Sequence, residues 1–347
     1  MKHVIVVTGA TGNVGRRVAE RLLTAGLEVR VIARTAEKLA PLGALGADVR
    51  PGRLGDPAFL TQVFDGATAA FLLTPADLST RDVNAEQKKN IQSMVTAIRD
   101  SGLPNAVLLS SWGAELPDPV GGIVGCHHFE LLLKEIPALN VVCLRPVWFM
   151  ENFLWNIGLI KMAGINGLAI EPRVRFPMIA TRDIAAAAAN HLQRLDFRGH
   201  SVRYLNGPRD YTMTEVTQIL GGVIGKPQLR YINVPERILR KGVVNTGGLS
   251  PNAADLLIET NRGINSGRIT AEPRSTSNTT PTTLEEFAKT TFAPAFGAVP
   301  DPSLSRRLAG RLLRSVVAFD RANCGGRHNP HRSSAAPMNY GGATYLH

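Results

Sequence analysis

Short apolar runs alternate with helical stretches through the first half of the chain. Residues 4–7 (Val-Ile-Val-Val) form a β-branched run that is typical of a central strand buried on both faces. Val14, Val18 and Leu22 follow at helical spacing. Because this alternation continues, we predict an α/β fold with a doubly wound parallel sheet, the Rossmann arrangement, whose ligands lie across the carboxyl ends of its strands. Further strands are predicted at 28–33, 47–50, 69–73, 106–110 and 140–144, and helices near 36–44, 57–64 and 80–101.

The second half of the chain predicts a smaller lobe. A strand at 177–181 leads into an alanine-rich helix over 182–193, which resembles a return to the sheet. Asp183 in the first turn of that helix is a charge that the helix dipole favours. Short β-like pieces at 202–205 and 229–232 lie between helical stretches, and we expect them in an α/β lobe over the strand ends. The predicted division is a Rossmann domain over 1–199, the smaller lobe over 200–297 and a tail over 298–347.

Three glycines follow the first strand, at Gly9, Gly12 and Gly15. The first permits a tight turn, the second lets a pyrophosphate approach the backbone, and the third lets the helix pack closely against the strand. The free amide groups at the start of that helix favour an anion. A structural turn without ligand is the alternative, and the flanking strand and helix favour a dinucleotide site.

The second strand ends at Arg34, where a site that prefers NAD places a carboxylate for the ribose hydroxyls. Arg34, together with Lys38 one helical turn later, is suited to the 2′-phosphate of NADP. The alternative is that both are solvated surface charges. The position favours NADP(H) over NAD(H) as cofactor.

Composition and charge narrow the class of protein. The chain has 347 residues, 44% of them hydrophobic, which suits an ordinary globular protein. The formal net charge is +11, and residues 298–347 supply +5 of it, from seven Arg against Asp301 and Asp320. The body has no nucleic-acid-binding motif, so we expect no direct nucleic-acid partner. No run of 18 apolar residues and no signal peptide is present, and the three cysteines are scattered, so we expect a cytoplasmic protein with reduced thiols and no transmembrane segment.

The tail has a composition of its own. Residues 303–319 could form a basic amphipathic helix that contacts an acidic membrane or a partner, or a frayed segment without function. Residues 323–347 are expected to be disordered. Cys324, His328 and His331 lack a fourth ligand, so we predict no metal site.

Taken together, several segments resemble the NmrA-like family of atypical short-chain dehydrogenase/reductases, over about residues 1–295. The family implies an extended Rossmann fold and NAD(P)(H) binding. Its members include quinone and azo-dye reductases as well as catalytically silent redox sensors that act on transcription regulators. The segments that carry the resemblance are residues 8–15, Arg34, residues 72–75, 108–111, 144–153 and 181–184.

The resemblance also implies a set of cofactor-binding residues. At residues 52–54 this chain reads Gly-Arg-Leu where relatives carry Gly-Asp-Leu, so an adenine contact from that carboxylate is absent. Arg53 could instead stack on the adenine, add to the phosphate-binding charge or face water. The predicted contacts are Gly9, Thr11, Gly12, Asn13, Val14 and Gly15 for the pyrophosphate turn, Arg34 and Lys38 for the 2′-phosphate, Thr74 and Pro75 for the ribose, Pro146, Val147, Trp148 and Phe149 beside the nicotinamide, and Leu54 and Ser111 elsewhere along the cofactor.

The catalytic Tyr-x-x-x-Lys pair of standard short-chain dehydrogenases is missing, since the first tyrosine is Tyr204. Residues 126–130 (Cys-His-His-Phe-Glu) occupy the corresponding helix. We predict His128 as a candidate proton donor, with Glu130 or a backbone carbonyl setting its tautomer. The alternative is that His127 and His128 only cover the start of the helix.

Two functions remain open at the level of sequence. The first is an NADPH-dependent reductase that transfers hydride to a small flat electrophile such as a quinone, held beneath Trp148 and Phe149 unless those aromatics belong to the core. A quinone needs no strong acid, because its hydroquinone anion has a pKa of about 10 and water can protonate it. The second is a sensor of the NADPH/NADP ratio that acts through a protein partner.

Overall fold

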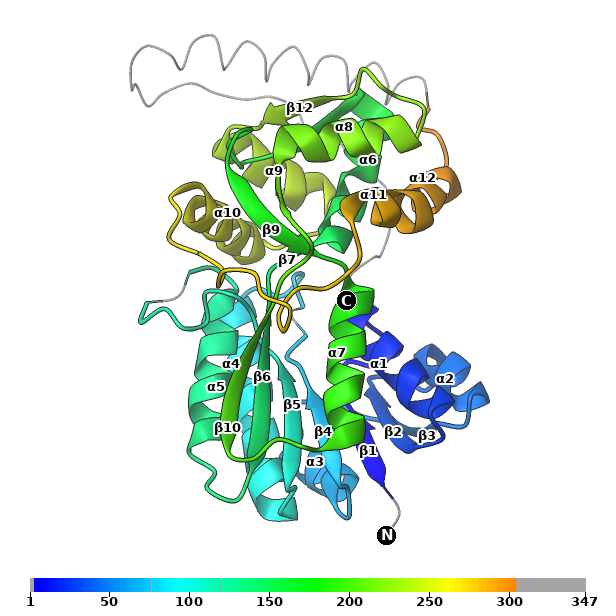
Figure 1. Cartoon of the computed structure of the whole chain (residues 1–347), viewed down its shortest axis with the longest axis vertical. Helices are drawn as coiled ribbons and strands as arrows, with labels where there is room; N and C mark the ends of the chain where they lie inside the picture. Colours follow the sequence, from blue (N-terminus) through cyan, green and yellow to red (C-terminus); the bar gives the residue numbers. More distant parts are fainter. Residues whose placement is uncertain (1–2, 76, 119, 304–347) are drawn as a thin grey trace.

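The computed structural model describes residues 3–75, 77–118 and 120–303 and contains a seven-stranded parallel sheet (Figure 1). The strand order is β10-β6-β5-β4-β1-β2-β3, and every neighbouring pair runs parallel. The predicted doubly wound α/β sheet is therefore confirmed. Its strands are β1 (Val4–Val7), β2 (Glu28–Ala33), β3 (Asp48–Pro51), β4 (Ala69–Leu72), β5 (Asn105–Leu109), β6 (Asn140–Pro146) and β10 (His200–Leu205).

Helices cover both faces of the sheet, because its central strands are apolar on both faces. Ile5 and Val7 of β1 face one core, and Val6 faces the other. The first core is covered by α1 (Asn13–Thr24), α2 (Ala40–Ala44) and α7 (Thr181–Arg194), and the second by α3 (Pro57–Phe64), α4 (Val83–Ser101) and α5 (Ile123–Lys134). A short 3-10 turn, η1 (Glu37–Leu39), precedes α2.

A smaller lobe lies over the carboxyl ends of the main strands (Figure 1). It contains two small sheets, with strand orders β11-β9-β7 and β12-β8. This arrangement confirms the predicted smaller α/β region. Its elements are β7 (Trp148–Phe149), η2 (Met150–Asn156), α6 (Ile157–Ala163), β8 (Ile165–Leu168), β9 (Arg175–Ile179), β11 (Asp210–Thr212), α8 (Met213–Val223), β12 (Arg230–Asn233), α9 (Glu236–Thr246), α10 (Pro251–Asn265), α11 (Leu284–Phe287), η3 (Ala288–Phe292) and α12 (Ala293–Ala298).

Two strands lie in a different sheet from the one expected. The piece at 202–205 was expected in the smaller lobe, but β10 pairs with β6 at the edge of the main sheet. The strand that precedes α7 was expected to return to the main sheet, but β9 pairs with β7 and β11. The reason is the path of α7, whose 14 residues carry the chain back along the sheet, so the next strand starts at the amino end and runs parallel to β6. The main sheet therefore includes a strand that follows residue 199, namely β10. The smaller lobe includes strands that precede it, namely β7, β8 and β9.

The predictions for the tail helix, the disordered end and the residues Cys324, His328 and His331 fall on residues 304–347, which lie outside the described residues. Over the part that the structure describes, no helix combines the length and the apolar character needed to cross a membrane.

Candidate functional site

The glycine turn brings β1 and α1 into close contact. Gly9 adopts a left-handed conformation with φ of 61°, and Gly12 N donates to Gly9 O at 3.0 Å. A Cβ atom on Gly15 would lie 2.3 Å from Gly9 O, far inside van der Waals contact. Gly15 is therefore required for the close helix–strand packing that the spacing predicts.

The N-terminus of α1 fits a pyrophosphate. Gly12 is the N-cap, no side chain caps the helix, and its first turn has no acidic residue. The amide groups of that turn are thus left for an anion, which the helix dipole also favours. Thr11 is exposed beside the turn and Asn13 is half-buried, whereas Val14 is packed in the core.

Thr8 ties the turn to the neighbouring strand, a role that the sequence analysis missed. Its hydroxyl donates to Phe71 O at 3.0 Å and accepts from Leu73 N at 2.9 Å. These bonds fix the start of the segment that carries Thr74 and Pro75, both half-buried. The signal in the sequence is a threonine directly after an apolar strand. In the structure its side chain is fully buried.

The end of β2 is positively charged and open. The Arg34 side chain is 68% exposed and forms an ion pair with Asp77 at 3.3 Å. Lys38 lies exposed in η1. Arg53, in place of the usual acid, is also exposed, while Leu54 packs partly against the second core. The guanidinium of Arg34 is thus accessible to a phosphate.

The predicted residues at the end of β6 are mostly covered. Pro146 and Val147 are buried, and Trp148 lies in the core with its ring edge-on to Phe176 at 5.9 Å between centroids. Phe149 keeps part of its surface exposed. Ser111, after β5, is half-buried and donates to Trp112 O. Phe149 and Ser111 are therefore the members of this group with accessible surface.

A polar network that the sequence analysis missed joins the carboxyl ends of β5 and β6 to α5. Ser110 Oγ donates to Glu130 Oε1, and Arg145 donates to both oxygens of Glu130, at 3.0 and 2.6 Å. Arg145 also donates to Tyr204 OH at 2.9 Å and pairs with Glu115. An arginine at the end of an apolar strand and a glutamate on the facing helix were the available signals.

The network keeps the Tyr204 phenol protonated. Burial, and then the hydrogen bond with Glu115, raises the pKa of Tyr204 to about 12. Tyr204 is consequently protonated at neutral pH and does not resemble the activated tyrosine of standard short-chain dehydrogenases. The geometry supports a positioning role for these groups.

The two histidines of α5 differ in their surroundings. His127 Nδ1 forms a hydrogen bond of 2.7 Å with Ala114 O. Burial, and then the charge of Lys88, lowers the pKa of His128, so its imidazole is neutral at pH 7. Its Nε2 is buried without a hydrogen-bond partner among the residues described. Nε2 of His128 is therefore free to form a hydrogen bond. The charged groups that act on the imidazole lie on or next to α4 and α5.

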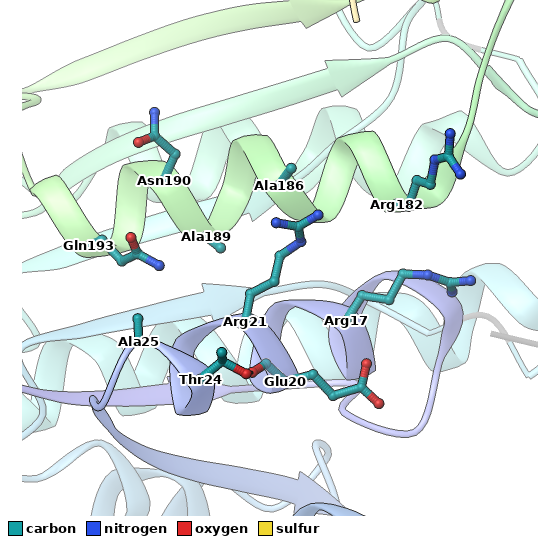
Figure 2. A pocket seen from close by; sticks show the side chains of 10 residues that line it. All are labelled: Arg17, Glu20, Arg21, Thr24, Ala25, Arg182, Ala186, Ala189, Asn190 and Gln193. Carbon is teal, nitrogen blue, oxygen red and sulfur yellow. The ribbon is translucent and has the colours of Figure 1, made fainter. Parts of the chain in front are cut away.

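A groove of about 610 Å³ lies between α1 and α7 (Figure 2). Arg21 of α1 reaches across it toward α7, and Arg17 and Arg182 also line it, but none of the predicted cofactor residues does. Arg17 donates to Asn13 O at 2.8 Å, and Arg182 pairs with Glu286 and donates to Thr282. The groove is thus separate from the glycine turn. Two of its three arginines, Arg17 and Arg182, already form hydrogen bonds or ion pairs with other residues of the protein.

The model of the NmrA-like family matches residues 1–288. The chain belongs to the NmrA-like family.

Proteins of similar sequence include several reductases. One, from Streptomyces griseus, is a (4-alkanoyl-5-oxo-2,5-dihydrofuran-3-yl)methyl phosphate reductase, 32% identical over 65% of this chain and 75% of that protein. Another, from Xenophilus azovorans, is an NAD(P)H azoreductase, 27% identical over 85% of this chain and 100% of that protein. A solved structure, an Escherichia coli NADPH-dependent quinone oxidoreductase complexed with NADPH, superposes with a TM-score of 0.69. It is 24% identical and covers 83% of this chain and 99% of its own, which shows the shared fold.

Proposed function

We propose that this chain is an NADPH-dependent reductase that passes hydride to a small, flat, conjugated electrophile such as a quinone. The observation that carries the proposal is the pairing of an uncapped α1 N-terminus with Arg34 at the end of β2. The first suits the pyrophosphate and the second the 2′-phosphate of the cofactor. The bound dinucleotide supplies the hydride.

The names of the relatives support the class of acceptor. An azo dye, a quinone and an alkanoyl-dihydrofuranone each offer a conjugated unsaturated centre, although the rest of each molecule differs. The part-exposed Phe149, next to the cofactor residues expected after β6, is suited to contact a flat ring. We therefore place the acceptor beside Phe149.

The proton can come from solvent. Hydride and one proton convert a quinone into its hydroquinone, and the anion formed first has a pKa of roughly 10, so water can protonate it. Ser110 and Arg145 both donate to Glu130, which suits these three residues to shape the site. Positioning of acceptor and cofactor then supplies most of the rate.

His128 is the candidate for a proton donor from the protein, but its lowered pKa leaves the imidazole mostly neutral at pH 7, which favours water as the donor. If it donates, His128→Ala lowers kcat roughly 100-fold while the Kd for NADPH is unchanged. His127→Ala is the matched control on the same helix. An unchanged kcat in His128→Ala would remove this residue from the mechanism.

The test of the function is anaerobic oxidation of NADPH by the purified chain against quinones, azo dyes and aldehydes. Gly12→Trp, which blocks the phosphate turn, is the control. Turnover of conjugated acceptors well above that control is the expected result. If no acceptor is reduced faster than in the Gly12→Trp control, the proposed reductase activity is contradicted.

A second function, a sensor of the NADPH/NADP ratio with a protein partner, is favoured by two observations. The polar groups at the strand ends are bonded to one another, and no activated Tyr-Lys pair is present in the sequence. Tight NADPH binding without turnover, together with partner binding that depends on the NADPH/NADP ratio, would support the sensor.

A further inference from the structure

The ion pair between Arg34 and Asp77 spans the nucleotide site. In the main sheet, β1 lies between β4 and β2. Arg34 directly follows β2 and Asp77 comes shortly after β4, so the pair bridges across the carboxyl end of β1. The glycine turn begins at that end. The pair is therefore placed where the adenosine half of a dinucleotide lies in this fold.

Asp77 is held in position by its own turn. Its Oδ1 accepts from Ser79 N at 3.1 Å and from Ser79 Oγ at 2.5 Å, and Thr80 N donates to its carbonyl oxygen at 3.1 Å. The hydrogen bond from the Ser79 side chain is the main cause that lowers the pKa of Asp77, and Arg34 adds to it. The carboxylate is thus an ordered anion at neutral pH.

Arg34 forms no other ion pair with the described residues, and most of its side chain is in solvent. An exposed pair of this kind contributes little to stability, so its partner can be exchanged easily. Asp77 accepts a single hydrogen bond from Arg34, Nη1 to Oδ2 at 3.3 Å. A 2′-phosphate carries more negative charge than a carboxylate and has the oxygens to accept two hydrogen bonds from a guanidinium.

We propose that Asp77 competes with the 2′-phosphate of the cofactor for Arg34 and thereby sets how strongly the protein prefers NADPH to NADH. This inference rests on the proposed use of NADPH. Binding of NADPH exchanges the Asp77 carboxylate for the phosphate, whereas NADH has no phosphate and leaves the pair intact. Asp77 consequently weakens NADPH binding selectively.

The test measures the Kd of NADPH and of NADH for the wild type, Asp77→Asn, Arg34→Ala and the double variant. Asn keeps an oxygen that accepts from Ser79, so the turn is retained. We expect Asp77→Asn to tighten NADPH binding roughly threefold to fivefold and to leave NADH binding unchanged. Arg34→Ala is expected to weaken NADPH binding about 10-fold to 100-fold. The gain from Asp77→Asn disappears in the Arg34→Ala background.

Asp100→Asn is the matched control, since it removes the same charge near the far end of α4. The proposed competition is refuted if Asp77→Asn leaves the ratio of the Kd for NADPH to the Kd for NADH unchanged. It is equally overturned if the gain persists without Arg34, which would indicate general charge repulsion. Equal losses of NADPH and NADH affinity in Arg34→Ala would instead contradict the 2′-phosphate contact in the proposed function.

Discussion

At the scale of single residues, the nucleotide turn depends on glycines, which have no side chain. Gly15 packs on the carbonyl of Gly9, and Gly9 itself needs a positive φ. These demands are satisfied only by glycine, because any Cβ at Gly15 overlaps backbone that cannot rotate away. The residue type is thus restricted more strictly at Gly9 and Gly15 than at the polar positions around the turn.

Replacement of Gly15 by alanine is expected to lower the free energy of unfolding by roughly 1–3 kcal/mol, because α1 must move away from β1. The same shift displaces the amides of the first turn, so NADPH binding weakens as well. Urea unfolding and a binding titration measure the two effects.

Gly222→Ala is the control, since Gly222 also lies in a helix but has open space around its Cβ position. This change should stabilise α8 by about 0.5–1 kcal/mol. Equal effects of the two substitutions would contradict the close packing at Gly15.

Glu151 is a buried carboxyl group that links η2 to the start of α7. Its oxygens accept from Thr181 N at 3.1 and 3.0 Å, and Oε1 also accepts from Thr181 Oγ1 at 2.5 Å. Burial raises the pKa of Glu151 despite these donors. The folded protein therefore holds the proton more tightly than the unfolded chain does.

This shift predicts a pH dependence of stability. A group whose pKa is raised by folding stabilises the fold below its unfolded value, about 4.3, and loses that contribution as the pH rises through the folded value. The wild type should therefore lose stability relative to Glu151→Gln between pH 4 and pH 7. Urea unfolding of both proteins over this range measures the difference, and a constant difference would show that the pKa is not raised.

At the scale of elements, one ion pair joins a strand to the helix that covers it. Arg145 ends β6 and Glu130 lies on α5, and their side chains are only 11% and 12% exposed. Such a pair is costly to break, because the remaining charge stays buried. The pair thus fixes α5 against the strand ends.

Glu130→Gln should lower the free energy of unfolding by about 3 kcal/mol, because Arg145 loses its shortest ion pair and keeps only the longer one with Glu115, at 3.3 Å. The double variant Glu130→Gln with Arg145→Met should be less destabilised than the sum of the two single variants. A double-mutant cycle from urea unfolding measures the coupling. Additive effects of the two changes would contradict a buried pair.

At the scale of the whole molecule, the predicted cofactor residues all lie within residues 9–149, and the described chain ends at residue 303. Lys161 Nζ donates to Val299 O and pairs with Asp301 at 3.2 Å, so the last described residues are attached to α6. The remaining residues, 304–347, carry seven Arg against Asp320, which is +6 of the net charge of +11.

Truncation after residue 303 is expected to leave the Kd for NADPH unchanged, since all predicted contacts and the attachment at Lys161 remain. Any weak, salt-sensitive binding of the full chain to DNA should disappear with these charges. A titration with NADPH and a DNA-binding assay test both points. A Kd for NADPH that rises more than about threefold would show that the tail contributes to the site.

The sequence by itself determined the parallel sheet, the glycine turn and the charge at the end of β2. These features follow from local causes, namely buried β-branched runs, helical spacing and the conformational freedom of glycine. It also determined that no Tyr-x-x-x-Lys pair is present near the site. Only the tertiary structure decided that 200–205 joins the main sheet, because pairing depends on where α7 returns the chain. It alone brought Asp77 to Arg34 and Glu130 to Arg145, since 43 and 15 residues separate these partners and no local pattern encodes contacts of that range.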